Sequence, residues 1–153
     1  MQHPLSTSSL RRAVVLAVAW VAGQAGHETA DYLVQRDCDA RAKQQHTPEG
    51  RRALANHALS YGLTQAATRA LAYRVAGLRV PVRAQLAAAV VETAAHAVID
   101  DGRALAAFAD TTGKRGFHAL AAHGVNGRAL MDQAAHKGVQ IPLGAAVTAA
   151  LAD

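Results

Sequence analysis

The chain has 153 residues, which is enough for one domain with a buried core. Hydrophobic residues make up 51% of it and aromatic residues only 4%, so alanine supplies much of the apolar content and favours an all-α bundle. The single cysteine, Cys38, excludes an intrachain disulfide, and the formal net charge of +5 suits an anionic small-molecule or nucleic-acid ligand.

The apolar runs along the chain are short for a membrane span. Residues 13–26 form the longest nearly apolar run, below the roughly 20 residues that a bilayer requires. Residues 84–99 are also mostly apolar, but they carry Glu92 and His96. Arginines precede the first run, as in a signal peptide, yet no convincing cleavage region follows it. We therefore expect no transmembrane span and a cytoplasmic protein.

Helix signals appear in order from the N-terminus. Residues 1–8 are polar and are expected to form a disordered tail, with Ser-Thr-Ser-Ser offering an N-cap for a helix over 10–35. The periodicity is lost over 36–49, and Thr-Pro-Glu then predicts the start of a second helix over 48–76, closed by Gly77. Pro81 predicts the start of a third helix over 81–99, which the Asp-Asp-Gly at 100–102 ends.

The remainder of the chain is expected to be helical in shorter pieces. Short helices are predicted over 103–109 and 114–122, with a loop over 123–127. A last segment over 128–151 should be kinked or split by Gly138 and Pro142. No strand-like alternation is found, so residues 9–153 are predicted to form a single compact bundle of about five to seven helices.

Three His/Asp pairs share the spacing of four residues that places both side chains on one helical face. They are His27 with Asp31, His96 with Asp100, and Asp132 with His136. The second helix adds a row at the same spacing, formed by His57, Tyr61 and Gln65, and Glu92 lies one turn before His96.

Imidazoles and carboxylates on facing helices can converge on one ion inside a bundle. Such nitrogen and oxygen ligands suit one or two ions of zinc, manganese, iron, nickel or cobalt. The predicted ligands are His27, Asp31, His57, His96, Asp100, Asp132 and His136. The alternatives are a polar network of His–Asp pairs that fixes helix register, or unconnected surface pairs.

Other residues are assigned supporting roles. Asp101 or Glu92 is the candidate general base toward a metal-bound water. Lys43 and Arg51, near the start of the second helix, are candidate phosphate contacts. The candidates for orienting the ligands are Gln35, Tyr61 and Gln133. The histidines expected to be exposed are His3, His46, His118 and His123.

The stretches GHETADYLVQ, GRRALANHALSYGLTQA, HAVIDD, TGKRGF and LMDQAAH together resemble a family of small helical actinobacterial proteins. Many of its members are labelled transcriptional regulators, and the family is akin to a bacterial membrane family of unknown function with the same His-x-x-x-Asp and Asp-Gln-x-x-His signatures. The resemblance covers roughly residues 20–137. It implies recurring polar positions at His27, Asp31, Gln35, His57, His96, Asp100, Asp132, Gln133 and His136.

The chain departs from the family pattern after Asp132. Where relatives have bulky apolar residues around the last histidine, this chain has AAHKGVQIP, with Lys137 beside His136. The last helix is therefore expected to be less apolar than in the family, which argues against membrane association.

Two functional hypotheses follow. The preferred one is a metal-dependent hydrolase acting on a phosphoester or nucleotide-like substrate. The alternative is a non-enzymatic transcriptional regulator, or a DNA-binding or interaction module, whose His/Asp pairs are structural or metal-sensing. No helix-turn-helix signature supports the regulator. A structural protein of a mobile element and a homo-oligomeric assembly stay open.

Overall fold

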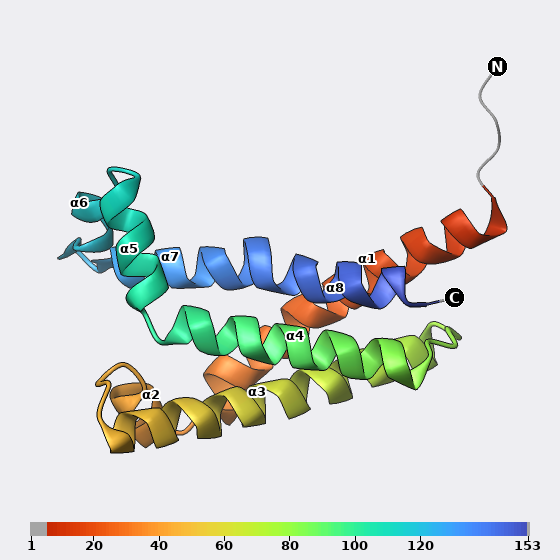
Figure 1. Ribbon diagram of the computed structural model, residues 1–153, viewed down its shortest axis with the longest axis horizontal. Helices are drawn as coiled ribbons and strands as arrows, with labels where there is room; N and C mark the ends of the chain where they lie inside the picture. The colour runs from red at the N-terminus through yellow and green to blue at the C-terminus, as the bar shows by residue number, and fades with distance from the viewer. Residues whose placement is uncertain (1–5, 153) are drawn as a thin grey trace.

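The computed structural model describes residues 6–152 of the chain, and four long helical rods run along its length (Figure 1). The first rod is α1 (Thr7–Thr29), continued by the π-helical turn η1 (Ala30–Val34). The second is α3 (Pro48–Val75) and the third is α4 (Val82–Asp100). The fourth rod comprises α7 (Gly127–Ala135), the π-helical turn η2 (His136–Gln140) and α8 (Ile141–Ala150).

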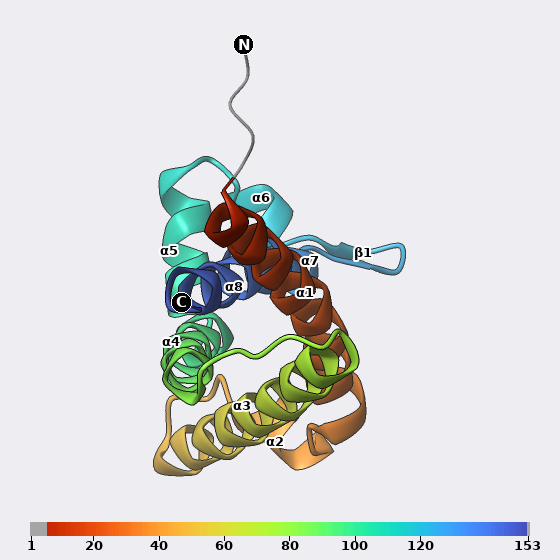
Figure 2. The same ribbon diagram turned by 90° about the vertical axis from the view of Figure 1, so that its right-hand side faces the viewer.

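The rods form a closed bundle in which α1 and α4 each pack against both α3 and α8 (Figure 2). The short elements gather at the end of the bundle remote from both termini (Figure 1). They are α2 (Asp37–Ala42), α5 (Arg103–Thr111), α6 (Arg115–His118), β1 (Ala121–Ala122) and β2 (Val125–Asn126). The predicted all-α class is confirmed.

Capping hydrogen bonds are found at the predicted starts and ends of the helices. The Ser6 side chain accepts from the Ser9 N–H at 3.1 Å and the Thr47 side chain accepts from the Gly50 N–H at 3.0 Å, as N-cap residues do. Gly77 ends α3 with a φ of +66°, and the Leu78 N–H returns to the Tyr73 carbonyl at 2.8 Å. Because α1 begins at Thr7, the predicted tail is wrong for residues 7 and 8. Its residues 1–5 lie outside the described part of the chain.

The connecting segments differ most from the predictions. The stretch 36–49 contains the helix α2. The helix predicted over 114–122 is reduced to α6, after which β1 pairs with β2 in a two-residue antiparallel hairpin. His123 and Gly124 form its turn, with φ of +53° and +79°, the left-handed pair that tight hairpins require. Strands this short carry no alternation from which a strand could be predicted.

The last rod is neither split nor broken at Gly138 and Pro142. Proline has no N–H to donate to the carbonyl four residues earlier, and the rod accommodates it by widening the preceding turn. Within that turn the Ile141 N–H donates to His136, five residues back. The first rod also ends in a widened π-helical turn, in which the Gln35 N–H donates to the Ala30 carbonyl, five residues back, at 2.8 Å.

The interior of the bundle is built from small apolar and polar side chains. Its apolar cluster consists of Val15, Ala19, Tyr73, Val80, Ala84, Ala145, Ala149 and Ala152. Large aliphatic side chains face outward instead; Leu63 on α3 is 74% exposed and Val90 on α4 is 69% exposed. Among the described helices, α4 alone is long and apolar enough to pass a length-and-hydropathy test for a membrane span, a test that a soluble core helix also passes.

Candidate metal centre

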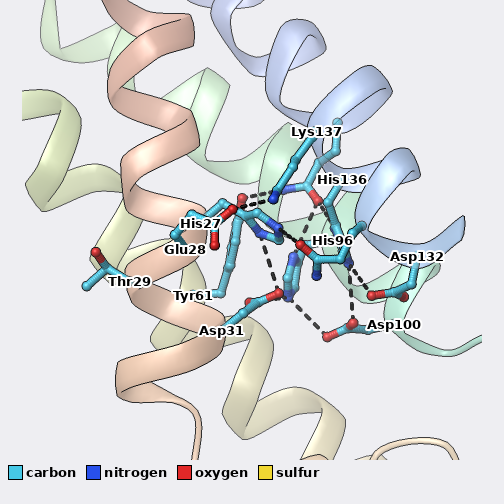
Figure 3. Close-up of polar contacts among 12 residues, drawn as sticks. His27, Glu28, Thr29, Asp31, Tyr61, His96, Asp100, Asp132, His136 and Lys137 are labelled. Atoms are coloured by element: carbon cyan, nitrogen blue, oxygen red, sulfur yellow. Dashed lines mark hydrogen bonds and ion pairs between the residues drawn. The ribbon is translucent and has the colours of Figure 1, made fainter. Parts of the chain in front are cut away.

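Four histidines from four different rods meet in the interior of the bundle, and three of them, His27, His96 and His136, are labelled in Figure 3. His27 comes from α1, His57 from α3, His96 from α4 and His136 from η2, and each is at most 1% exposed. Histidine side chains are usually only partly buried in proteins. Four wholly buried imidazoles in one place therefore need a common hydrogen-bonding or metal partner.

The Nε2 atoms of His57 and His96 form the centre of this cluster and lie 2.9 Å apart. Asp100 Oδ2 lies 3.1 Å from His57 Nε2 and 3.0 Å from His96 Nε2. Asp31 Oδ1 lies 3.4 Å from the first nitrogen and 3.9 Å from the second. Metal–ligand bonds of about 2.1 Å place neighbouring donor atoms about 3.0–3.4 Å apart in octahedral or tetrahedral shells. His57, His96 and Asp100 therefore have the spacing of a ligand shell, and Asp31 fits it on the His57 side but lies farther from His96.

The second oxygens of the same two aspartates face the flanking histidines. Asp100 Oδ1 lies 3.4 Å from His136 Nε2, and Asp132 Oδ2 lies 3.5 Å from that same nitrogen. Asp31 Oδ2 lies 3.5 Å from His27 Nδ1. The structure thus brings all three predicted pairs, together with His57, into one cluster, where they form three groups able to hold a metal ion. His96 and His136 each belong to two of these groups.

Two glutamine amides orient three of the four imidazoles. The carbonyl oxygen of Gln140 lies 3.3 Å from His96 Nδ1 and 2.5 Å from His136 Nδ1. Because an amide oxygen only accepts, both Nδ1 atoms carry hydrogen and both Nε2 atoms face the cluster, where each can offer a lone pair once its imidazole is neutral. The carbonyl oxygen of Gln133 lies 3.0 Å from His27 Nε2 and leaves the lone pair on Nδ1, beside Asp31. Hydrogen bonds of this kind behind ligand histidines are typical of metal sites.

Several buried atoms of the cluster have no hydrogen-bond partner. They are His27 Nδ1, Asp31 Oδ1, both oxygens of Asp100, and His136 Nε2. Leaving buried polar atoms without partners is costly. A bound cation would satisfy those of them that it contacts, so the residues present fit a metal ion.

The cluster also partly compensates its own charges. Burial opposes the charged form of Asp100, but His136, His57 and His96 outweigh it and hold the pKa of this carboxyl below its usual range. Burial likewise disfavours charged His136, yet Asp100 and Asp132 raise its pKa to about 10. The pKa of His27 and that of His96 are lowered, chiefly by burial, so these imidazoles are neutral, as metal ligands must be.

Lys43 supplies one positive charge to the cluster. Its Nζ lies 2.9 Å from Asp100 Oδ1, and the side chain is 14% exposed. The predicted phosphate contact is therefore placed beside a predicted ligand. Arg51, the other predicted phosphate contact, is exposed and donates to the His46 carbonyl at 3.3 Å.

The two predicted general bases lie away from the cluster. Glu92 is buried in an ion pair with Arg69 and reaches the histidines only through Tyr61 and Gln140. Asp101 lies at the surface and faces Arg103. Consecutive helical residues point about 100° apart, so the fold that turns Asp100 inward turns Asp101 outward.

The predicted orienting residues have mixed placements. Tyr61 stacks on the His96 ring, with centroids 3.6 Å apart, and its hydroxyl accepts from Gln65 and Gln140, each at 2.6 Å. Gln133 bonds His27 as described. Gln35 has a buried amide nitrogen with no partner. Lys137 pairs with Glu28 at the edge of the site (Figure 3).

Sequence reasoning missed the roles of Gln140 and Arg69. Gln140 lies four residues after His136, and Arg69 extends the row of His57, Tyr61 and Gln65 by one more turn. The spacing of four residues was thus a usable signal in both helices. Gln140 was obscured by Pro142, which suggested that the helix was broken there.

Two glycines let α1 approach this polar interior. A Cβ on Gly26 would collide with the Gln65 amide, and one on Gly23 would lie 2.7 Å from both the Arg69 guanidinium and Ile141. The glycines that weaken the helix in sequence terms are therefore required by the packing.

No protein-family model, curated protein or solved structure matches this chain. The resemblance to the actinobacterial family stays a prediction. The candidate metal centre rests on the geometry of the buried His/Asp cluster.

Proposed function

We propose that this chain binds a divalent transition metal at the His/Asp cluster and acts as a metal-dependent hydrolase on a phosphoester or nucleotide-like substrate. One observation carries the proposal: imidazole and carboxylate donors from three helical rods lie close together around His57 Nε2 and His96 Nε2. The mixture of nitrogen and oxygen donors favours zinc, manganese, iron, nickel or cobalt over calcium.

The residues divide into two overlapping sets. His57, His96 and Asp31 would hold one ion, with Asp100 Oδ2 beside both imidazoles, and Asp100 with His136 and Asp132 would hold a second. Lys43 already neutralises Asp100 on the second side, so one ion plus this lysine is the simpler charge balance. Such an ion supplies Lewis-acid chemistry, polarising a phosphoryl oxygen and activating water.

The side chains of the chain itself perform the remaining tasks. Gln133 and Gln140 hold the imidazoles in the tautomers that bind metal. The rods exclude water from the four histidines, while Asp132 and Lys43 remain 19% and 14% exposed. A substrate would therefore approach past Asp132 and Lys43, where the lysine can also contact a phosphate oxygen.

The test is elemental analysis of the purified protein, followed by thermal unfolding with added zinc or manganese. We expect stoichiometric metal, a raised Tm on metal addition, and hydrolysis of p-nitrophenyl phosphate or its diester by the loaded protein. His57→Ala should abolish these effects, while His123→Ala, in the exposed hairpin turn, should leave them unchanged. Absence of metal together with no gain in Tm would overturn metal binding, and loaded protein without turnover would overturn the hydrolase.

A specific observation also favours the non-enzymatic alternative. Asp100 is contacted by Lys43 and three imidazoles, and the pKa of His136 is raised to about 10, so a metal-free ionic network is physically reasonable. In that case the cluster would fix helix register or sense metal in a regulator. This alternative predicts DNA binding that weakens steeply with salt, measured by fluorescence titration, and no turnover after metal loading.

A further inference from the structure

A polar pocket of about 220 Å³ opens at the end of the bundle that carries α2 and α5, outside the His/Asp cluster. Three separate segments form its walls: the α2–α3 loop, the α4–α5 turn, and the neighbourhood of α6 and α7. The side chains that carry its chemistry are Gln44, His46, Asp101, Arg103, His118 and Arg128. None of them belongs to the candidate ligand set.

Each wall of this pocket contains a residue that lies within four positions in the chain of a residue of the His/Asp cluster or of Lys43, which contacts the cluster. Gln44 follows Lys43, whose ammonium contacts Asp100, and Asp101 follows Asp100 itself. Arg128 lies four residues before Asp132, so both side chains project from the same face of α7. The pocket is therefore lined by residues that lie next to Lys43 and Asp100 in the chain and one helical turn before Asp132.

The pocket carries an excess of positive charge. Arg103 donates to both oxygens of Asp101, at 2.5 and 2.9 Å, and this pair is largely exposed. Arg128 makes only a long contact of 3.5 Å to the Gln44 amide. Two guanidiniums thus face one carboxylate, and Arg128 has most of its donors available. Guanidinium groups bind phosphate through paired hydrogen bonds, and such bonds are the stronger kind.

The backbone around the pocket is fixed in an uncommon conformation. Among residues 6–152, the non-glycine residues with positive φ are His46, at +55°, and His123. His46 directs its ring toward Asp101, with Nδ1 3.6 Å from Oδ2. Gly102 has a φ of +82° and lies against Gln44, whose amide would be 3.2 Å from a Cβ at that position. Non-glycine residues in this region are strained and concentrate at functional sites.

We propose that this pocket is an oxyanion subsite that holds the phosphate dianion of a phosphomonoester at the mouth of the cluster. The inference rests on the proposed hydrolase function and narrows its substrate class. A volume of about 220 Å³ is smaller than the roughly 300–1,000 Å³ of sites for larger ligands, so a phosphate with a short organic group fits better than a polynucleotide strand. Arg128 offers donors to the phosphate, and Arg103 can turn one of its N–H groups from Asp101 toward a dianion, which attracts a guanidinium more strongly than the single charge of a diester does.

The reaction follows from this placement. Water attacks phosphorus, a new P–O bond forms, and the ester P–O bond breaks. The leaving alkoxide takes a proton that originates from the attacking water, so the products are an alcohol and inorganic phosphate. Arg103 and Arg128 would hold oxygens of the phosphate, and Lys43 would face its cluster side.

The test measures binding of inorganic phosphate by calorimetry, together with steady-state kinetics on p-nitrophenyl phosphate and its diester. Arg128→Gln and Arg103→Gln should each weaken phosphate binding and raise KM for the monoester roughly tenfold or more, with a smaller rise in KM for the diester and with metal content and Tm unchanged. Arg115→Gln is the matched control, because Arg115 is exposed, pairs with Asp110 and lies outside the pocket. It should behave as the unmodified protein.

The outcomes separate this inference from the hydrolase proposal. If the metal-loaded protein turns over the monoester but both pocket variants keep its KM and the phosphate affinity, the subsite is wrong and the hydrolase stands. If no substrate is turned over but the two variants alone lose phosphate affinity, the anion subsite stands and the hydrolase is wrong. Equal loss in Arg115→Gln would show a non-specific charge effect and overturn the subsite.

Discussion

The two halves of this bundle are built from the same four rods but are packed in opposite ways. Toward the chain termini, the rods meet through Val15, Ala19, Ala84 and other small apolar side chains, which need no partner beyond van der Waals contact. Toward α2 and α5 they meet through imidazoles and carboxylates, several of whose buried atoms lack a hydrogen-bond partner. The apolar half is held mainly by van der Waals contact, although the buried Tyr73 hydroxyl also lacks a partner, whereas the polar half calls for a cation.

The buried Arg69–Glu92 pair marks the border between these halves. Arg69 donates to the Ala19 carbonyl at 3.1 Å on the apolar side, and Glu92 accepts from Gln65 at 3.1 Å on the polar side. The pair satisfies its own charges without a metal. It therefore provides the first way to test how independent the two halves are.

The largest effect is expected from Arg69→Ala, which leaves Glu92 buried without its cation. Breaking one partner of a buried pair costs about 3–5 kcal/mol. Burial raises the pKa of Glu92 even with Arg69 present, so the folded state holds the proton more tightly than the unfolded chain. The loss should therefore grow as pH rises above the ordinary carboxyl value. Urea unfolding at several pH values measures it.

The control for this prediction is Arg69→Met combined with Glu92→Met. Replacing both charges by apolar groups should cost less than removing one. A double variant as unstable as Arg69→Ala at every pH would contradict the assignment of the loss to an unpaired charge.

The second effect is the removal of metal, which should divide the molecule along the same border. A ligand at a hundred times its Kd stabilises the folded state by about 2.7 kcal/mol. Chelation should therefore lower Tm and speed amide hydrogen exchange around His57 and His136, while the amides around Ala84 and Ala145 change only with global stability. Uniform exchange changes along all four rods would show that the halves do not differ in this way.

A smaller effect is expected from Gln140→Leu, which keeps the approximate size of the side chain but removes the acceptor shared by His96 and His136. Loss of a hydrogen bond behind a ligand typically weakens metal binding about 10- to 100-fold. Competition against a chromogenic chelator measures the affinity. Gln85→Leu makes the same chemical change in the apolar half, where Gln85 bonds the Val80 carbonyl, and should leave metal affinity unaltered.

The smallest effect concerns the helix caps, one in each half. Ser6→Ala and Thr47→Ala each remove a side-chain acceptor at a helix start and should cost about 1 kcal/mol. Denaturant unfolding measures both. Only the Thr47 variant, which lies next to the loop carrying Lys43, should also weaken metal binding. Equal metal affinity in the two variants would show that this loop does not contribute to the site.

The sequence was most informative where the physics is local. Thr47 with Pro48, and Gly77, predict helix ends because capping needs only neighbouring residues. The spacing of His27 and Asp31, and of the two later pairs, predicts side chains on one helical face for the same reason. These features are present as expected, and the pairs meet.

The sequence could not show which side chains of each helix face the cluster, because this depends on how the helix is rotated against its neighbours. It predicts Asp100 as a ligand from its spacing to His96, but it also predicts Asp101 as a general base at the same site, and the packing of α4 against α3 and α8 turns Asp101 away. Glu92 was predicted as a general base at the metal site, but it pairs with Arg69, and only the fold brings these two residues together. The hairpin at His123 has strands too short for any pattern to be visible.

The π-helical turn η2 has a consequence for how such a rod can evolve. A helix of constant pitch presents a single stripe to its neighbours, and one stripe would have to serve both halves of the bundle. In the fourth rod the inward stripe runs through Asp132, His136 and Gln140, then restarts one residue later at Ile141 and continues through Ala145 and Ala149. The extra residue in η2 rotates the inward face of the rod at the point where the polar half of the bundle meets the apolar half. Substitutions that refine one half can therefore accumulate without turning the other half away from its partners.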